Sequence, residues 1–134
     1  MAFDVPYGIT RRLAHTKLAE ARPRVQAALG AEGFGVLTEI DMQRTLQQKL
    51  GVERPPYLIL GACNPKLANR ALGEEPAIGL MLPCNVVLAE EGEDVVVSAA
   101  SPRAMFSVVE KPSAELSAVA AEAEERLRRA LDAL

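Results

Sequence analysis

The strongest constraint on the fold is a short apolar run that is bounded by proline at both ends. Residues 57–63, Tyr-Leu-Ile-Leu-Gly-Ala-Cys, follow the pair Pro55-Pro56 and precede Asn64-Pro65. Because the paired prolines exclude a helix, the run is predicted to be a central strand that is covered on both faces. Asn64 followed by Pro65 predicts the N-cap and the first residue of a helix.

The other strands and helices follow from the spacing of apolar residues and from cap signals. Strands are expected at residues 7–13, 34–40, 85–89 and 94–99, and helices at residues 16–29, 42–50, 65–72 and 113–134. Asp41 is the expected N-cap of the second helix, and Gly51 is its expected stop. The last two strands form a hairpin, whose charged turn at residues 90–94 is expected to be solvated. This order of elements predicts an α+β fold.

Two of the expected helices carry distinctive residues. Pro23 lies inside the first helical pattern, so a kink is expected there, or a helix that begins after residue 16. The last helix carries three acid–base pairs at four-residue spacing, which stabilise a solvated helix face. They are Glu122 with Arg126, Glu124 with Arg128, and Glu125 with Arg129.

Composition excludes several classes of protein. The 134 residues are 49% hydrophobic and 25% charged, which fits one globular domain over residues 1–134 and excludes intrinsic disorder. With 9 Gly, 9 Pro and 2 Cys, the chain is neither collagen-like nor a disulfide scaffold. No signal-peptide pattern or membrane-length apolar run occurs, so we expect a cytoplasmic protein without a membrane partner. A net charge of -3 and the absence of Trp argue against a nucleic-acid partner.

The two cysteines are the sharpest candidates for chemistry. Cys63 ends the apolar run where a helix is expected to begin, and a helix N-terminus lowers the pKa of a nearby thiol. Cys84 follows Pro83 at the start of the predicted hairpin. If the two ends converge, the thiols could bind a soft metal such as Cu(I) or Zn(II), or undergo reversible oxidation. The alternative is plain packing, because free cysteine is often a buried apolar residue.

An enzyme that uses Glu39, Asp41 and His15 is a weaker hypothesis. Asp41 is expected to cap a helix, Glu39 to face solvent, and His15 to lie in a loop. The strand at 34–40 is expected to place its apolar side chains on the face opposite Glu39: Phe34, Val36 and Ile40. No Gly-rich phosphate motif occurs either, so no catalytic residue is assigned and a non-enzymatic role is favoured.

A series of motifs in fixed order carries a family resemblance. The motifs are Gly33-Phe34-Gly35-Val36, Glu39-Ile40-Asp41, the segment 56–65 that ends in Cys63-Asn64-Pro65, and Leu82-Pro83-Cys84-Asn85-Val86. Over residues 7–105, this series resembles the family called domain of unknown function 302. The resemblance implies a small α+β fold of β-α-β(4)-α plan, similar to half of the TATA-binding protein, and a homodimer. Many members look like Phe-Gly-Asn-Pro at positions 61–65, so the resemblance implies that the cysteine belongs to a subset.

The leading hypothesis is a dimeric, non-enzymatic domain that binds a small ligand or a protein partner. The expected crevice lies between a helix start and a strand start, where backbone N–H groups would accept an anion or a carbonyl of the ligand. Its candidate residues are Cys63, Asn64, Pro65, Pro83, Cys84 and Asn85. The alternative is a thiol site at Cys63 and Cys84. No cofactor is required by the first hypothesis, and a soft metal ion is the candidate under the second.

Overall fold

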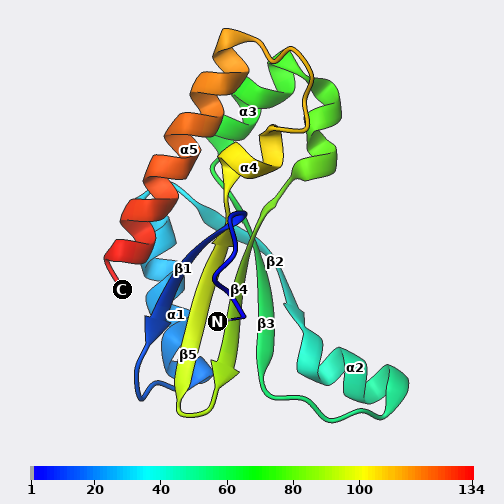
Figure 1. The fold of residues 1–134 in the computed structure, drawn as a ribbon, viewed down its shortest axis with the longest axis vertical. Helices are drawn as coiled ribbons and strands as arrows, with labels where there is room; N and C mark the ends of the chain where they lie inside the picture. Colours follow the sequence, from blue (N-terminus) through cyan, green and yellow to red (C-terminus); the bar gives the residue numbers. More distant parts are fainter. Residues whose placement is uncertain (1) are drawn as a thin grey trace.

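One antiparallel sheet of five strands organises the part of the chain that this computed structural model describes, residues 2–134 (Figure 1). The strands are β1 (Gly8–Leu13), β2 (Gly35–Asp41), β3 (Tyr57–Cys63), β4 (Cys84–Glu91) and β5 (Asp94–Ala100). Their order in the sheet is β1-β5-β4-β3-β2, so β3 is an interior strand while β1 and β2 are the edges. The predicted hairpin is β4 and β5, and the predicted α+β class is confirmed.

Helices cover one face of the sheet. Helix α1 (Leu18–Ala31) and the C-terminal half of α5 (Ala114–Asp132) pack on that face. Alternate strand residues supply the sheet side of the core: Ile9, Leu13, Leu58, Leu60, Ala62, Val86, Leu88, Val95, Val97 and Ala99. With the shorter helices set aside, the order is β-α-β(4)-α, as the resemblance implies.

The opposite face of the sheet is only partly covered. The N-terminal residues cross it, where the Thr10 hydroxyl donates to the Phe3 carbonyl at 3.0 Å. Helix α2 (Met42–Leu50) flanks it beside β2 and β3 (Figure 1). The Tyr57 and Ile59 side chains of β3 on this face are only half-buried, so the prediction that β3 is covered on both faces is wrong.

A second apolar cluster lies beyond the end of the sheet. It is formed by α3 (Pro65–Glu74), the short helices η1 (Pro76–Met81) and α4 (Pro102–Phe106), and the N-terminal half of α5 (Figure 1). Leu116 and Val119 of α5 belong to this cluster, whereas Leu127 and Leu131 belong to the sheet core. Helix α5 therefore joins the two cores.

Helix starts follow the cap signals in most places. The Asp41, Asn64 and Ser113 side chains accept hydrogen bonds from backbone N–H groups at the starts of α2, α3 and α5. Helix α1 differs, because Lys17 is its N-cap and provides no side-chain hydrogen bond. It begins at Leu18 and continues through Pro23, which has no N–H to offer its own helix.

The predicted facing of β2 is wrong at Ile40. Val36 pairs with Ala62 and Thr38 with Gly61, so Leu37 is an extra residue that forms a bulge. A bulge reverses the facing of the residues that follow it. Val36 therefore points toward the helices, and Ile40 points to the open face. Glu39 faces α1, where it pairs with Arg22 at 2.6 Å instead of meeting only solvent.

The predicted solvated tip is confirmed for Gly92 and Glu93 in the middle of the hairpin turn, but it is wrong for Glu90 and Asp94. The Glu90 carboxylate accepts a hydrogen bond from the Leu18 N–H at 2.9 Å, at the start of α1. Asp94 accepts one from the His15 N–H at 3.1 Å and also pairs with Arg12. The hydrogen bond from the His15 N–H has the larger effect and the contact with Arg12 the smaller one, and both lower the pKa of Asp94. The turn therefore holds the β1–α1 connection against the sheet.

The helices of residues 2–134 include none with the length and apolar character that a membrane crossing requires.

Candidate functional site

The structure brings the two cysteines to one end of the sheet. Cys63 is the last residue of β3, and Cys84, the first residue of β4, pairs with Ala62. Both thiols are free. They line a hollow of only about 30 Å³, which is walled by Phe34, Leu67 and other apolar side chains. That is space for about two water molecules, so a larger ligand would require these side chains to move.

The environment of the thiols suppresses the thiolate. Burial raises the pKa of Cys63, and it raises the pKa of Cys84 to about 11, with a further contribution from the charge of Cys63. The expectation that the α3 N-terminus lowers the Cys63 pKa is therefore wrong, because loss of hydration dominates. In residues 2–134, no group of three or more His, Cys, Asp and Glu residues is placed to hold a metal ion.

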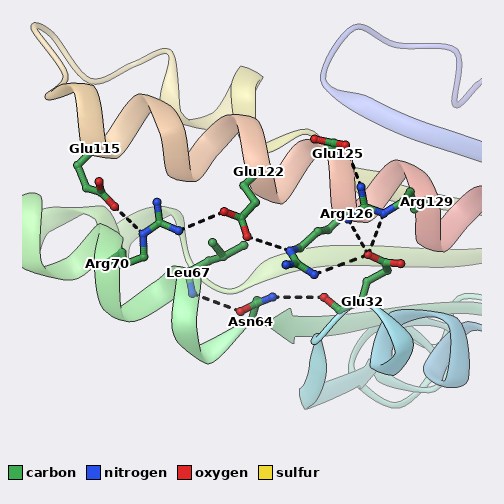
Figure 2. Close-up of polar contacts among 9 residues, drawn as sticks. All are labelled: Glu32, Asn64, Leu67, Arg70, Glu115, Glu122, Glu125, Arg126 and Arg129. Atoms are coloured by element: carbon green, nitrogen blue, oxygen red, sulfur yellow. Dashed lines mark hydrogen bonds and ion pairs between the residues drawn. The ribbon is translucent and has the colours of Figure 1, made fainter.

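The Asn64 side chain makes contacts within the protein at both of its ends (Figure 2). Its Oδ1 accepts from the Leu67 N–H at 3.2 Å, and its Nδ2 donates to the Glu32 carbonyl at 3.3 Å. Pro65 contributes no N–H to the helix start. Asn64 therefore fastens the start of α3 to the end of α1, which leaves little of this helix terminus for a ligand.

The other predicted crevice residues lie beside the cysteines. Pro83 follows a cis peptide bond, and its Cγ lies 2.8 Å from where a Cβ on Gly61 would stand. Asn85 pairs with Gly61 and is exposed on the open face. All six predicted site residues thus gather where β3 ends and β4 begins, and whether a ligand binds there stays a prediction.

A ladder of ion pairs explains much of the charge on α5 (Figure 2). Arg70 of α3 pairs with Glu115 at 2.5 Å and with Glu122 at 3.2 Å. Arg126 pairs with Glu122 at 3.0 Å and lies 3.8 Å from Glu32, which also pairs with Arg129. The three pairs predicted along α5 are all present. These charges connect α1, α3 and α5 and have a structural role.

A much larger hollow lies elsewhere, on the open face of the sheet. This cleft has a volume of about 520 Å³. It is lined by Phe3, Met42, Leu46, Arg54, Pro55, Pro56, Tyr57, Ile59, Ala89, Glu90 and Glu91. We call it the sheet-face cleft. The sequence predicted the helix at 42–50 but not the cleft, because the lining comes from segments that are far apart in the chain.

Most polar groups at the margin of the sheet-face cleft have partners in the protein. Glu91 pairs with Arg12 at 2.5 Å, and Glu90 accepts the Leu18 N–H. The Arg54 carbonyl accepts from the Gln43 side-chain amide at 2.8 Å, which ties the loop before β3 to α2. The cleft is thus an apolar floor with a fixed polar margin.

The residues of the enzyme hypothesis are not brought together. His15 follows β1 at one edge of the sheet, whereas Glu39 and Asp41 belong to β2 at the other edge. The His15 imidazole is exposed, and its Nδ1 lies 3.4 Å from Glu93. Asp41 caps α2 by accepting the Arg44 N–H at 2.9 Å. Each of these side chains has a local structural partner.

The fold therefore defines a small α+β domain with a half-open sheet, and comparison with known proteins gives its family. Residues 9–134 match the family described as domain of unknown function DUF302, so the chain belongs to that family, as the sequence motifs indicate. The match continues through α5, beyond the motif series at 7–105.

A solved structure gives the same answer. The crystal structure of an uncharacterized conserved DUF302 protein from Bacillus stearothermophilus is similar, with a TM-score of 0.86 and 31% sequence identity. The alignment covers 96% of this chain and 98% of that one. No curated protein matches the chain.

Proposed function

We propose that this domain binds a small, largely apolar molecule and that the ligand occupies the sheet-face cleft. The single observation that carries the proposal is the cleft itself, with a volume of about 520 Å³ and a mainly apolar lining. Ligand pockets in proteins measure roughly 300–1,000 Å³ and are lined mostly by apolar and aromatic side chains with a few fixed polar groups. The sequence also predicts a ligand-binding function, but it places the ligand beside Cys63 and Cys84 and not in the sheet-face cleft.

The construction of the cleft also supports a binding role. Tyr57 and Ile59 project from β3, a strand that hydrogen-bonds to neighbours on both sides. Met42 and Leu46 come from α2 and form the side wall. Side chains on a rigid strand keep their positions without a ligand, which lowers the entropy cost of binding.

The test uses the neutral fluorophore N-phenyl-1-naphthylamine and two substitutions on one helix. Leu46 lines the cleft, whereas Leu50, one turn later on α2, is 70% exposed and does not line it. We expect Leu46→Glu to weaken binding by about tenfold or more, because a carboxylate would enter the apolar site. Leu50→Glu should bind the fluorophore like the wild type. Absence of binding to the folded wild type, or equal binding by both variants, would overturn the proposal.

The homodimer that the family resemblance implies is proposed at the β2 edge. Leu37 is 66% exposed there and Ile40 is 45% exposed, on a strand with one side unpaired. An exposed apolar edge strand is a ready surface for pairing with a second chain. Sedimentation equilibrium should give twice the chain mass for the wild type and the single-chain mass for Leu37→Glu. A monomeric wild type would contradict this.

A thiol site at Cys63 and Cys84 is the second candidate, favoured by one observation. The two free thiols belong to adjacent strand ends and line the same hollow. Titration of free thiols together with elemental analysis of protein purified without reductant or chelator tests it. A stoichiometric soft metal that is lost in Cys63→Ser would support this role, and two slowly reacting thiols without metal would exclude it. The cytoplasmic location, in which such thiols would be reduced, stays a prediction.

A further inference from the structure

We propose that the ligand of the sheet-face cleft is an amphipathic anion, whose apolar body lies in the cleft and whose head group lies between Arg54 and Arg44. This inference rests on the proposed function and adds the chemical class of the ligand. The head group is a terminal carboxylate or phosphate, because these are the anions that a guanidinium binds best.

The first observation is that a second, polar hollow shares Arg54 with the cleft. Arg54 lines the sheet-face cleft and also lines a hollow of about 440 Å³ that is formed by α2 and the segment after it. The lining of this second hollow is almost entirely polar: Gln43, Arg44, Gln47, Val52, Glu53 and Arg54. A molecule that fills both would need an apolar part and a polar part, joined at Arg54.

The second observation concerns the charges at the two ends of the cleft. Within residues 2–134, the guanidinium groups of Arg44 and Arg54 form no ion pair. At the other end, Glu91 pairs with Arg12, and Glu90 accepts the first N–H of α1. Glu90 and Glu91 therefore already have partners, whereas the two guanidinium groups can still bind an anion.

Two carboxylates lie close enough to compete with a ligand for these arginines. Glu53 lines the same polar hollow, yet it forms no ion pair with Arg44 or Arg54. Asp41 uses its carboxylate as the α2 cap and accepts the Arg44 backbone N–H at 2.9 Å. Gln43 and Gln47 add amide donors, although the Gln43 amide already donates to the Arg54 carbonyl. The net preference of the hollow is for a negative head group.

The experiment compares four ligands with the same ten-carbon chain: decanoate, decyl phosphate, decanol and decylammonium. Binding is measured by titration calorimetry, below the micelle concentration, on the wild type and on Arg54→Gln, Arg44→Gln and Arg24→Gln. Arg24 is the matched control, because it is an exposed arginine of α1 outside both hollows. Leu46→Glu tests occupancy of the cleft independently of the head group.

We expect the Arg54→Gln and Arg44→Gln variants each to weaken the binding of a ligand with an anionic head by about two- to fivefold, the range of an exposed ion pair. Decanol should bind these variants as it binds the wild type, and Arg24→Gln should change nothing. A selective loss for decanoate identifies a carboxylate head, and a selective loss for decyl phosphate identifies a phosphate head.

Three results would overturn the assignment, and they separate it from the proposed function. Equal binding of decanoate by the wild type and both arginine variants, with loss in Leu46→Glu, would leave the cleft as the site and exclude the anionic head. Preference for decylammonium would exclude the anionic head group and assign the head-group contact to Glu53 instead. Binding of none of the four ligands would overturn the anionic head group, and it would overturn the proposed function as well if N-phenyl-1-naphthylamine also fails to bind.

Discussion

At the scale of the residue, Gly61 stands at a crowded point of the sheet. A Cβ at this position would stand 2.1 Å from the Thr38 Oγ1 and 2.8 Å from the Pro83 Cγ. Real Cβ atoms do not approach other atoms so closely, so β2, or the cis-proline segment before β4, would have to move. We expect Gly61→Ala to lower the free energy of unfolding by about 1–3 kcal/mol, the usual cost of overpacking. Urea denaturation followed by circular dichroism measures it.

Two further substitutions separate this crowding from a general effect of adding a methyl group. Gly73 lies in α3 with nothing within 4 Å of its hypothetical Cβ. Gly73→Ala should therefore leave stability unchanged or raise it by up to about 1 kcal/mol. Thr38→Ala removes the closest atom, so it should cost less in the Gly61→Ala background than in the wild type. Equal costs in both backgrounds would contradict the geometry.

The thiols give a residue-scale prediction about pH. Burial raises the pKa of Cys84 from 9.0 to about 11, so the folded protein keeps a proton that the unfolded chain releases in this range. When the folded state holds more protons than the unfolded state, stability falls as pH rises. The free energy of unfolding should therefore decrease between pH 9 and pH 11.

The control variant is compared with the wild type by the slope of the unfolding free energy against pH, and not by its absolute stability. Cys84→Ala removes the titrating group, so its unfolding free energy should decrease less steeply over the same pH range. The rest of the chain is the same in both proteins, so its contribution cancels in the comparison. If the two pH profiles run parallel, Cys84 is not the group responsible.

At the scale of the element, one carboxylate connects α4 to α5. Glu124 is 5% exposed, and it accepts hydrogen bonds from the Ser101 hydroxyl at 2.6 Å and the Arg103 N–H at 3.2 Å. Arg128 also donates to it, at 2.8 Å. Hydrogen bonds to a charged group contribute about 1.5–3 kcal/mol each. Burial of the carboxylate offsets part of this sum, so we expect Glu124→Ala to destabilise the protein by about 2–3 kcal/mol in thermal or urea unfolding.

The neighbouring residue is a matched control on the same helix. Glu125 pairs with Arg129 at 2.9 Å, but its side chain is 72% exposed. An exposed pair of this kind contributes about 0.3–0.5 kcal/mol, so Glu125→Ala should change little. Equal destabilisation by the two variants would show that the contacts of Glu124 with α4 add no stability beyond that of an exposed ion pair.

Elements whose signals are local could be predicted from the sequence, whereas those that depend on distant partners could not. The caps at Asp41 and Asn64 were predictable because a cap involves only the next three residues. The bulge at Leu37 was not, because it follows from how β2 pairs with β3. Glu90 looked like a solvated turn residue, since its partner, the Leu18 N–H, lies 72 positions away.

At the scale of the whole molecule, the same distinction explains why the candidate site was only partly foreseen. The sequence grouped Cys63 with Cys84, and the structure places both at one end of the sheet. The sheet-face cleft, in contrast, combines Phe3, Leu46 and Ile59 from three separate segments. No periodicity or motif in one sequence reports such a convergence. The volumes of the sheet-face cleft and of the cysteine hollow could not be predicted from the sequence either. The larger volume of the cleft is what favours it as the ligand site.

Helix α5 makes the two apolar clusters one structural unit, and this leads to the last prediction. Leu127 is fully buried in the sheet core, while Val119 of the same helix is 2% exposed in the second cluster. Leu127→Ala should cost about 2–5 kcal/mol, as large-to-small core substitutions do. Because a rigid helix connects the clusters, the amides of α3 should lose as much hydrogen-exchange protection as those of β5. Val119→Ala should likewise lower protection in both regions. Loss confined to β5 in Leu127→Ala, with α3 unchanged, would show that the clusters open independently and that α5 does not transmit stability between them.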